Sequence, residues 1–72
     1  MKVNSYNNVI ERVRDELNSL TDKINKLKAF INSESYLNTN EMQQELLIMQ
    51  YDSMLDYQSC LIARIKNLEK GN

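Results

Sequence analysis

The chain contains no proline, and its only glycine is Gly71. Proline and glycine interrupt helices more strongly than other residues, so their near absence favours long, continuous helices. The 72 residues make one small domain at most. Within them, two long segments repeat apolar residues at the period of an amphipathic helix. We therefore predict an all-α fold with a single domain that spans residues 1–72.

The first apolar segment runs over residues 6–31. Its apolar residues recur every three or four positions, which places them on one side of a helix. They are Val9, Val13, Leu17, Leu20, Ile24, Leu27 and Ile31. Residues 32–39 break this period and are rich in residues that form turns and helix caps. We predict a first helix over about 6–31 and a connection over 32–39 that has room for one helical turn.

The second apolar segment predicts a helix over about 40–69 with more apolar surface than one partner helix covers. One stripe at helical spacing consists of Leu47, Tyr51, Met54, Leu61, Ile65 and Leu68. Further apolar residues lie on both sides of that stripe, at Ile48, Leu55 and Ile62 on one side and Leu46, Tyr57 and Cys60 on the other. At about 100° per residue, these sets together span roughly half of the helix circumference. A two-helix hairpin hides a narrower seam.

A short connection makes two consecutive helices antiparallel, so the sequence predicts a two-helix hairpin. In the register that aligns both apolar stripes, Gln58 is the one polar residue of the seam and lies opposite Leu17. A buried amide at such a position fixes the register at a cost in stability. The same register brings Arg64 level with Glu11, which predicts a solvated ion pair worth about 0–1 kcal/mol.

The apolar residues outside the seam require a further cover. A chain this short buries only about 60% of its unfolded surface and needs a disulfide, a metal or other subunits. The single Cys60 cannot form an internal disulfide, and the lack of histidine argues against a zinc site. The cover is a second copy, a different protein or a membrane, and a mixed, partly acidic polar face disfavours the membrane. We predict a homo-oligomer whose interface contains Leu46, Ile48, Leu55, Tyr57, Cys60 and Ile62.

Composition also limits the function. A net charge of −1 argues against binding to long nucleic acid but permits a small ligand with a few phosphates. Without histidine, a nucleophile motif or a glycine-rich phosphate loop, we expect neither catalysis nor a cofactor. The chain has no apolar run long enough to span a membrane and no signal-peptide core, which predicts a cytoplasmic protein. Tyr6 and Tyr57, at the edges of the apolar stripes, are either interface or ligand residues, because tyrosine rings stack on nucleobases.

Two segments resemble a known family of small phage proteins. They are ERVRDELNSLTDKINKLKAFI, residues 11–31, and ELLIMQYDSMLDYQSCLIARI, residues 45–65. The pattern ERV…EL…L…KI.KL..FI, a short loop and then LL..Q…M..Y…L..RI is similar to that of the second anti-CBASS family, related to a crAss-like phage protein. Its members are sponges that sequester the cyclic nucleotide messengers of bacterial antiphage defence. The resemblance implies a homohexamer of helical protomers, without catalysis, in the cytoplasm of the infected host cell.

The resemblance also implies a set of ligand-binding residues. In the family an N-terminal tyrosine stacks on a cyclic dinucleotide and a lysine of the first long helix contacts it, while a threonine and a late arginine serve a separate cyclic trinucleotide site. The lysine falls on Lys23 and the arginine on Arg64. The threonine position falls on Asn25, whose amide can still hydrogen-bond a base edge. The tyrosine position falls near Asn8, which is not aromatic, and Tyr6 is the ring two residues earlier.

Helix geometry separates these residues within one protomer. Tyr6 and Lys23 are about 25 Å apart along one continuous helix, so a pocket that uses both requires a second protomer. In the predicted register Arg64 lies far from Lys23, so the two belong to different sites. The alternative prediction is a small helical module that regulates a host or phage protein by binding it through the second helix.

Overall fold

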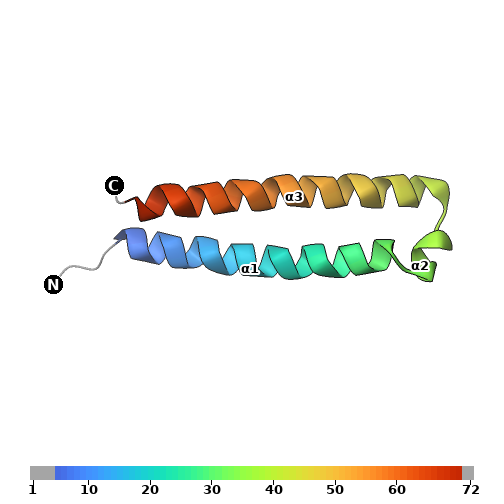
Figure 1. Ribbon diagram of the computed structural model, residues 1–72, viewed down its shortest axis with the longest axis horizontal. Coiled ribbons are helices and arrows are strands. Elements are labelled where there is room, and N and C mark those ends of the chain that lie inside the picture. Colours follow the sequence, from blue (N-terminus) through green and yellow to red (C-terminus); the bar gives the residue numbers. More distant parts are fainter. Residues whose placement is uncertain (1–4, 71–72) are drawn as a thin grey trace.

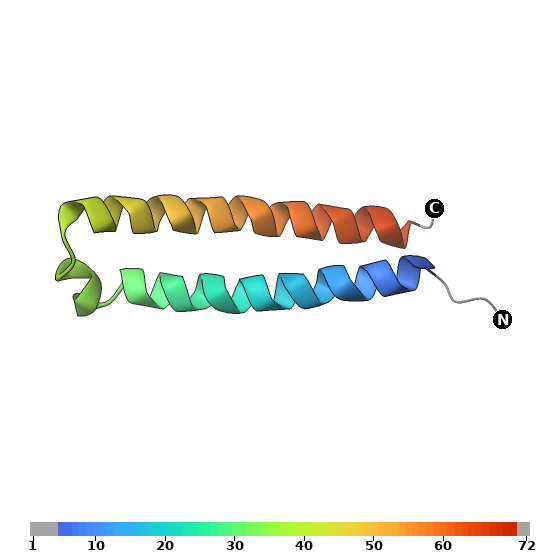
Figure 2. The same ribbon diagram turned by 180° about the vertical axis from the view of Figure 1, so that it is seen from behind.

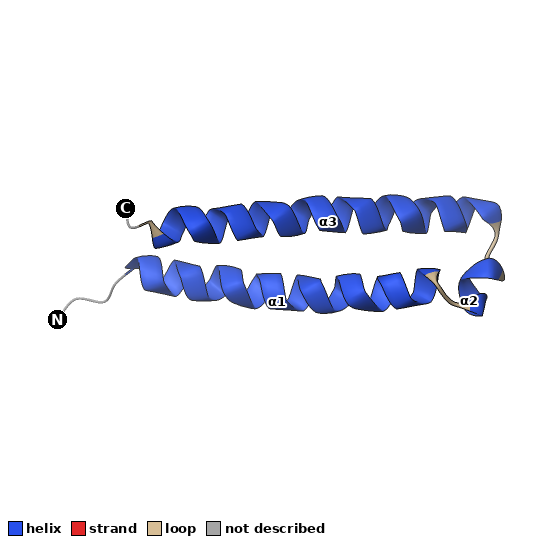
Figure 3. Ribbon diagram, viewed as in Figure 1, coloured by secondary structure: helices blue, strands red, loops and turns tan. Residues whose placement is uncertain are grey.

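In the computed structural model, the backbone is described for residues 5–70 and the side chains for residues 8–70. This part of the chain consists of three helices, α1 (Ser5–Ile31), α2 (Glu34–Leu37) and α3 (Glu41–Glu69). The long helices α1 and α3 run antiparallel side by side, and the short α2 closes one end of the hairpin (Figures 1 and 2). All regular structure in this range is helical, with loops at the joints between helices and a turn residue after α3 (Figure 3). The predicted all-α hairpin is confirmed, and its assembly into an oligomer stays a prediction.

Side-chain caps set the helix ends around the turn. Ser33 caps α2, where its Oγ accepts a hydrogen bond from the Tyr36 backbone N–H at 3.4 Å. Asn40 caps α3, where its Oδ1 accepts from the Gln43 N–H at 2.8 Å. Glu41 adds a favourable negative charge in the first turn of α3. The connection over 32–39 thus contains the helical turn for which it had room, and α3 begins directly after its cap.

Tyr36, in the turn, contacts both long helices. Its ring packs edge-on against Phe30 of α1, with the centroids 6.3 Å apart and the planes at 87°. Its hydroxyl donates to the backbone carbonyl of Gln44 in α3 at 3.2 Å. The Gln44 side chain donates in return to the carbonyls of Tyr36 and Thr39, at 3.1 and 3.2 Å. These contacts, together with the length of the connection, determine the direction in which α3 returns along α1.

The core is a single seam between α1 and α3. Its buried residues are Ile10, Val13, Leu20, Ile24, Leu61 and Ile65, of which Leu61 is fully buried. Every member of the two predicted stripes is buried or half-buried, including Gln58. Leu55, predicted at a subunit interface, is instead half-buried and packs against the seam. With extents of 57 × 15 × 14 Å, the hairpin is only two helices thick, so one seam is all the core that it encloses.

The polar contacts across the seam follow the tilt of the side chains. In both helices the Cα–Cβ bonds lean toward the helix's own N-terminus. In an antiparallel pair, a side chain therefore does not contact the residue of the other helix whose Cα lies at the same height. It contacts a residue about one turn further toward the C-terminus of that helix. Gln58 donates through Nε2 to Oγ1 of Thr21 at 3.1 Å, one turn beyond Leu17. The ion pair between Arg14 and Glu69 is displaced in the same direction, because Glu69 lies further toward the C-terminus of α3 than the residue level with Arg14. The predicted pair of Arg64 with its level acidic residue on α1 does not form among residues 8–70 and is wrong.

Candidate functional site

The two sides of the seam form two faces of the hairpin, which differ in their residues. On each helix, the residue after a seam residue lies on one face and the residue before it lies on the other, at about 100° per residue. A groove of about 380 Å³ confirms that both helices contribute their following residues to the same face. It is lined by Arg14, Leu17, Asn18, Ile62, Ile65, Lys66 and Glu69. The residues that precede seam residues therefore share the opposite face.

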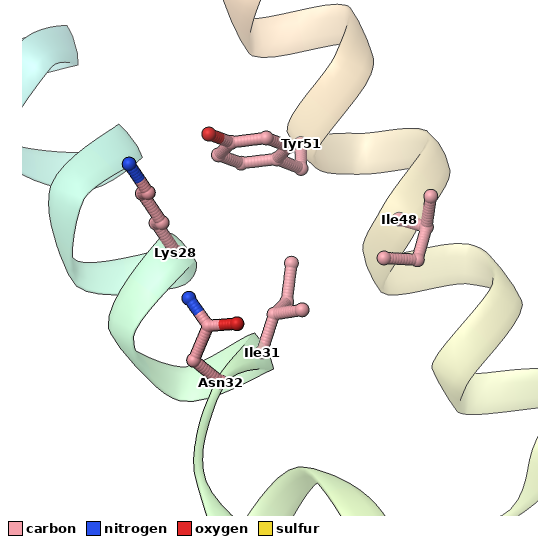
Figure 4. Close-up of a pocket in the computed structure, with 5 residues that line it drawn as sticks. All are labelled: Lys28, Ile31, Asn32, Ile48 and Tyr51. Atoms are coloured by element: carbon pink, nitrogen blue, oxygen red, sulfur yellow. The ribbon is translucent and has the colours of Figure 1, made fainter.

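We call the first of these the isoleucine face, because Ile48 and Ile62 are its exposed apolar residues, at 38% and 40% exposure. A second groove of about 240 Å³ lies on it near the turn. Figure 4 shows Lys28 of α1, and Asn32 just after its end, across this groove from Ile48 and Tyr51 of α3, with Ile31 projecting between the helices. Two of the six residues predicted at a subunit interface, Ile48 and Ile62, are thus solvent-accessible on this face.

We call the second the Tyr57 face, and it carries the other three exposed residues of the predicted interface. Leu46 and Tyr57 are 45% and 44% exposed, and Cys60 is an exposed free thiol. Close to the end of α3, Arg64 lines a shallow groove of about 310 Å³ together with Ala63, Asn67 and Leu68. An accessible ring and an accessible guanidinium therefore lie on the same side of α3, two helical turns apart.

Charge is unevenly divided between the two faces. Among the described residues that directly precede a seam residue, the charged ones are Arg12, Glu16, Lys23, Lys26 and Arg64. All five are exposed, so four cations face solvent with a single carboxylate. The isoleucine face is balanced, because Arg14, Lys28 and Lys66 share it with Glu11, Asp52 and Glu69. In a chain with a net charge of −1, the positions directly before seam residues are therefore mostly cationic.

The predicted site residues occupy both faces. Asn8, Lys23 and Arg64 lie exposed on the Tyr57 face, because each directly precedes a seam residue. Asn25 directly follows one and lies exposed on the isoleucine face. Tyr6 falls within α1, but its side chain is outside the described residues.

The residues that the resemblance implies for each of the two sites do not meet within one hairpin. Asn8 and Lys23 are about 22 Å apart along α1 at 1.5 Å per residue. Asn25 and Arg64 lie on opposite faces, so the two residues implied for a trinucleotide site do not meet within one protomer. Sites built from these residues therefore need side chains from more than one protomer.

Two cations of the Tyr57 face, Arg12 and Lys26, were not among the predicted site residues. The signal that identifies them is simple, since each lies directly before a seam residue, as Lys23 and Arg64 do. Within the part of the chain that the structure describes, no cluster of His, Cys, Asp or Glu could hold a metal ion. None of the described helices is long and apolar enough to cross a membrane.

Known proteins resemble this chain over most of its length. A family model described as Sequestin matches residues 7–67. An uncharacterized 7.5 kDa protein from the denB–rIIB intergenic region of Enterobacteria phage T4 is 43% identical over 54 residues, which cover 75% of this chain and 84% of that protein. No solved structure matches the chain.

Proposed function

The chain belongs to the Sequestin family, and we propose that it binds and sequesters cyclic di- or trinucleotide second messengers and so blocks CBASS signalling. The observation that carries this proposal is the charge of the Tyr57 face, where four exposed cations accompany one carboxylate. A positive patch on a slightly acidic protein attracts a small anion without favouring general binding to long nucleic acid. The relative in phage T4 and the resemblance of residues 11–31 and 45–65 to the anti-CBASS sponges support the same conclusion.

The proposed mechanism is binding alone, without a chemical step. Lys23 and Arg64 contact phosphate oxygens through charge-assisted hydrogen bonds, which are shorter and stronger than neutral ones. Asn25 and Asn8 offer amides that can donate to and accept from base edges. Because these residues do not converge within one hairpin, the sites form between protomers. The messenger is removed from signalling by mass action in the cytoplasm of the infected host cell, where sponge and messenger meet.

The same proposal assigns the exposed apolar residues to contacts between protomers of a homohexamer. Ile48 and Ile62 lie on one face, and Leu46 lies on the other. One neighbour cannot cover two opposite faces of a rod, so each protomer contacts at least two others. Closed symmetric assemblies are the usual way to cover such surfaces.

Calorimetry with a panel of cyclic di- and trinucleotides tests the proposal. We expect sub-micromolar binding of at least one member, with an affinity that falls as salt is added, because phosphates are held by exposed cations. The linear dinucleotides are the matched control for the cyclic ones. If the chain binds none of the panel below micromolar concentration, the proposal is wrong.

The second candidate function is a module that binds and regulates a host or phage protein. The observation that favours it is the row of exposed Ile48 and Ile62 beside the half-buried Leu55 on α3, since a helix with such a row can dock on a partner. Light scattering separates the two. A stable hexamer supports the sponge, whereas a monomer or dimer with this row uncovered supports the module.

A further inference from the structure

Lys23 of α1 and Tyr57 of α3 lie side by side on the Tyr57 face. The hydrogen bond from Gln58 to Thr21 joins the two helices at this level. Lys23 is two residues from Thr21 and Tyr57 is adjacent to Gln58, and the lean of the side chains that brings Gln58 to Thr21 acts on Lys23 and Tyr57 in the same direction. Both directly precede a seam residue and share one face. The hairpin thus presents a lysine from α1 and an exposed tyrosine from α3 at neighbouring positions on one face.

Tyr57 is the tyrosine that is available to a ligand among those whose side chains are described. Tyr36 is half-buried, with its ring against Phe30 and its hydroxyl on a backbone carbonyl. Tyr51 is half-buried and packs against the core cluster. Tyr57 alone of the three counts as exposed, at 44%, and it is not needed to close the seam. Its ring can therefore take up a flat partner without disturbing the core.

We propose that Tyr57 stacks on a base of the nucleotide whose phosphate Lys23 contacts. This inference rests on the proposed function, and it assigns the aromatic contact that Asn8 cannot supply. A phosphate and its base lie several ångströms apart within one nucleotide, so Lys23 and Tyr57 of one hairpin can contact both, in a site that a neighbouring protomer completes. The flanking charges Arg12, Lys26 and Arg64 on the same face favour an anion at this position.

The neighbourhood of Tyr57 favours a nucleotide over a purely apolar protein contact. Covering Tyr57 with apolar side chains would also remove water from the adjacent Lys23, and an ammonium without a partner is costly to desolvate. A nucleotide supplies a flat base for the ring and a negative charge for the ammonium together. Any of the bases can stack on an aromatic side chain, whatever hydrogen-bonding groups it carries at its edge, because every base has a π-face.

The test compares Tyr57→Leu, which removes the ring, with Tyr57→Phe, which keeps it, in calorimetry with the best ligand of the cyclic nucleotide panel. We expect Tyr57→Leu to bind about 5- to 150-fold more weakly, and Tyr57→Phe to bind within about threefold of the wild type, because the ring rather than the hydroxyl makes the stack. Equal affinity of Tyr57→Leu and wild type would overturn the inference but leave the proposed function standing. Failure of the wild type to bind any cyclic nucleotide overturns both.

Tyrosine fluorescence gives a second readout that does not require Tyr57→Leu to fold or assemble. A base stacked on Tyr57 quenches its emission, so ligand should lower the fluorescence of the wild type. The Tyr57→Phe variant should lose this quench while its affinity is kept, and the Tyr36→Phe variant, as matched control, should retain it. A quench of the same size in Tyr57→Phe and wild type would show that the ligand stacks elsewhere and would overturn the inference.

Discussion

Replacing Lys23 by glutamine is the sharpest test of which face of the hairpin binds the messenger. The side chain is exposed on the Tyr57 face and is not part of the seam, so the change removes one positive charge and leaves the core intact. A hydrogen bond to a charged group contributes about 1.5–3 kcal/mol, which corresponds to roughly a 10- to 150-fold loss of affinity. We expect Lys23→Gln to weaken cyclic dinucleotide binding within that range.

Lys28→Gln is the matched control, because it makes the same substitution on the same helix but on the isoleucine face. It changes the net charge equally, so any general electrostatic effect appears in both variants. Calorimetry at low and at physiological salt measures the two affinities, and light scattering checks that both variants keep the mass of the wild type. The difference between the variants should persist when added salt reduces the shared long-range attraction.

The reasoning is refuted if Lys23→Gln and Lys28→Gln bind the ligand equally well, or if Lys28→Gln is the weaker binder. The first result would mean that Lys23 contributes only to the general field of the protein. The second would move the site to the groove beside Ile31 and Tyr51 that Figure 4 shows.

Three further predictions concern stability. Leu61→Ala should lower the free energy of unfolding by about 2–5 kcal/mol, because a side chain with 1% exposure leaves a cavity; a urea-unfolding loss below 1 kcal/mol would contradict the assigned seam. Ile62 is the next residue along the chain but is exposed. If a second copy covers it, Ile62→Ala should lower the thermal unfolding midpoint by an amount that depends on protein concentration. A midpoint that does not depend on concentration would argue against such a cover. Asn40→Ala should cost about 1 kcal/mol through loss of the α3 cap, whereas Asn40→Ser should be nearly neutral; equal losses for both in urea unfolding would show that the cap bond contributes little.

Helix positions and the composition of the seam could be predicted from the sequence because they depend on local periodicity. Apolar residues at helical spacing identify the buried side of each helix before any partner is known. The Asn40 cap of α3 is equally local, since its hydrogen bond closes within three residues. The order of helix, turn and helix then leaves an antiparallel hairpin as the compact arrangement.

The polar contacts between the two helices were harder to predict from the sequence, because they depend on the direction in which side chains lean. Placing residues level with each other predicted a pair for Arg64 that is absent, whereas the tilt of both helices brings Arg14 to Glu69 and Gln58 to Thr21. Leu55 was assigned to a subunit interface because its spacing matches Ile48 and Ile62. Only the packing of α3 on α1 shows that it is half-buried while they are exposed.

The sequence by itself thus determined two long amphipathic helices, a capped turn and the residues of one seam, because each of these is encoded within a few residues along the chain. The tertiary structure decided which remaining side chains share a face. That grouping depends on how each helix is rotated about its own axis when the two pack antiparallel. In this hairpin, the residues that directly precede seam residues lie on the same side in both helices. It separates Asn25 from Arg64, and it puts Lys23 and the exposed Tyr57 on the same face.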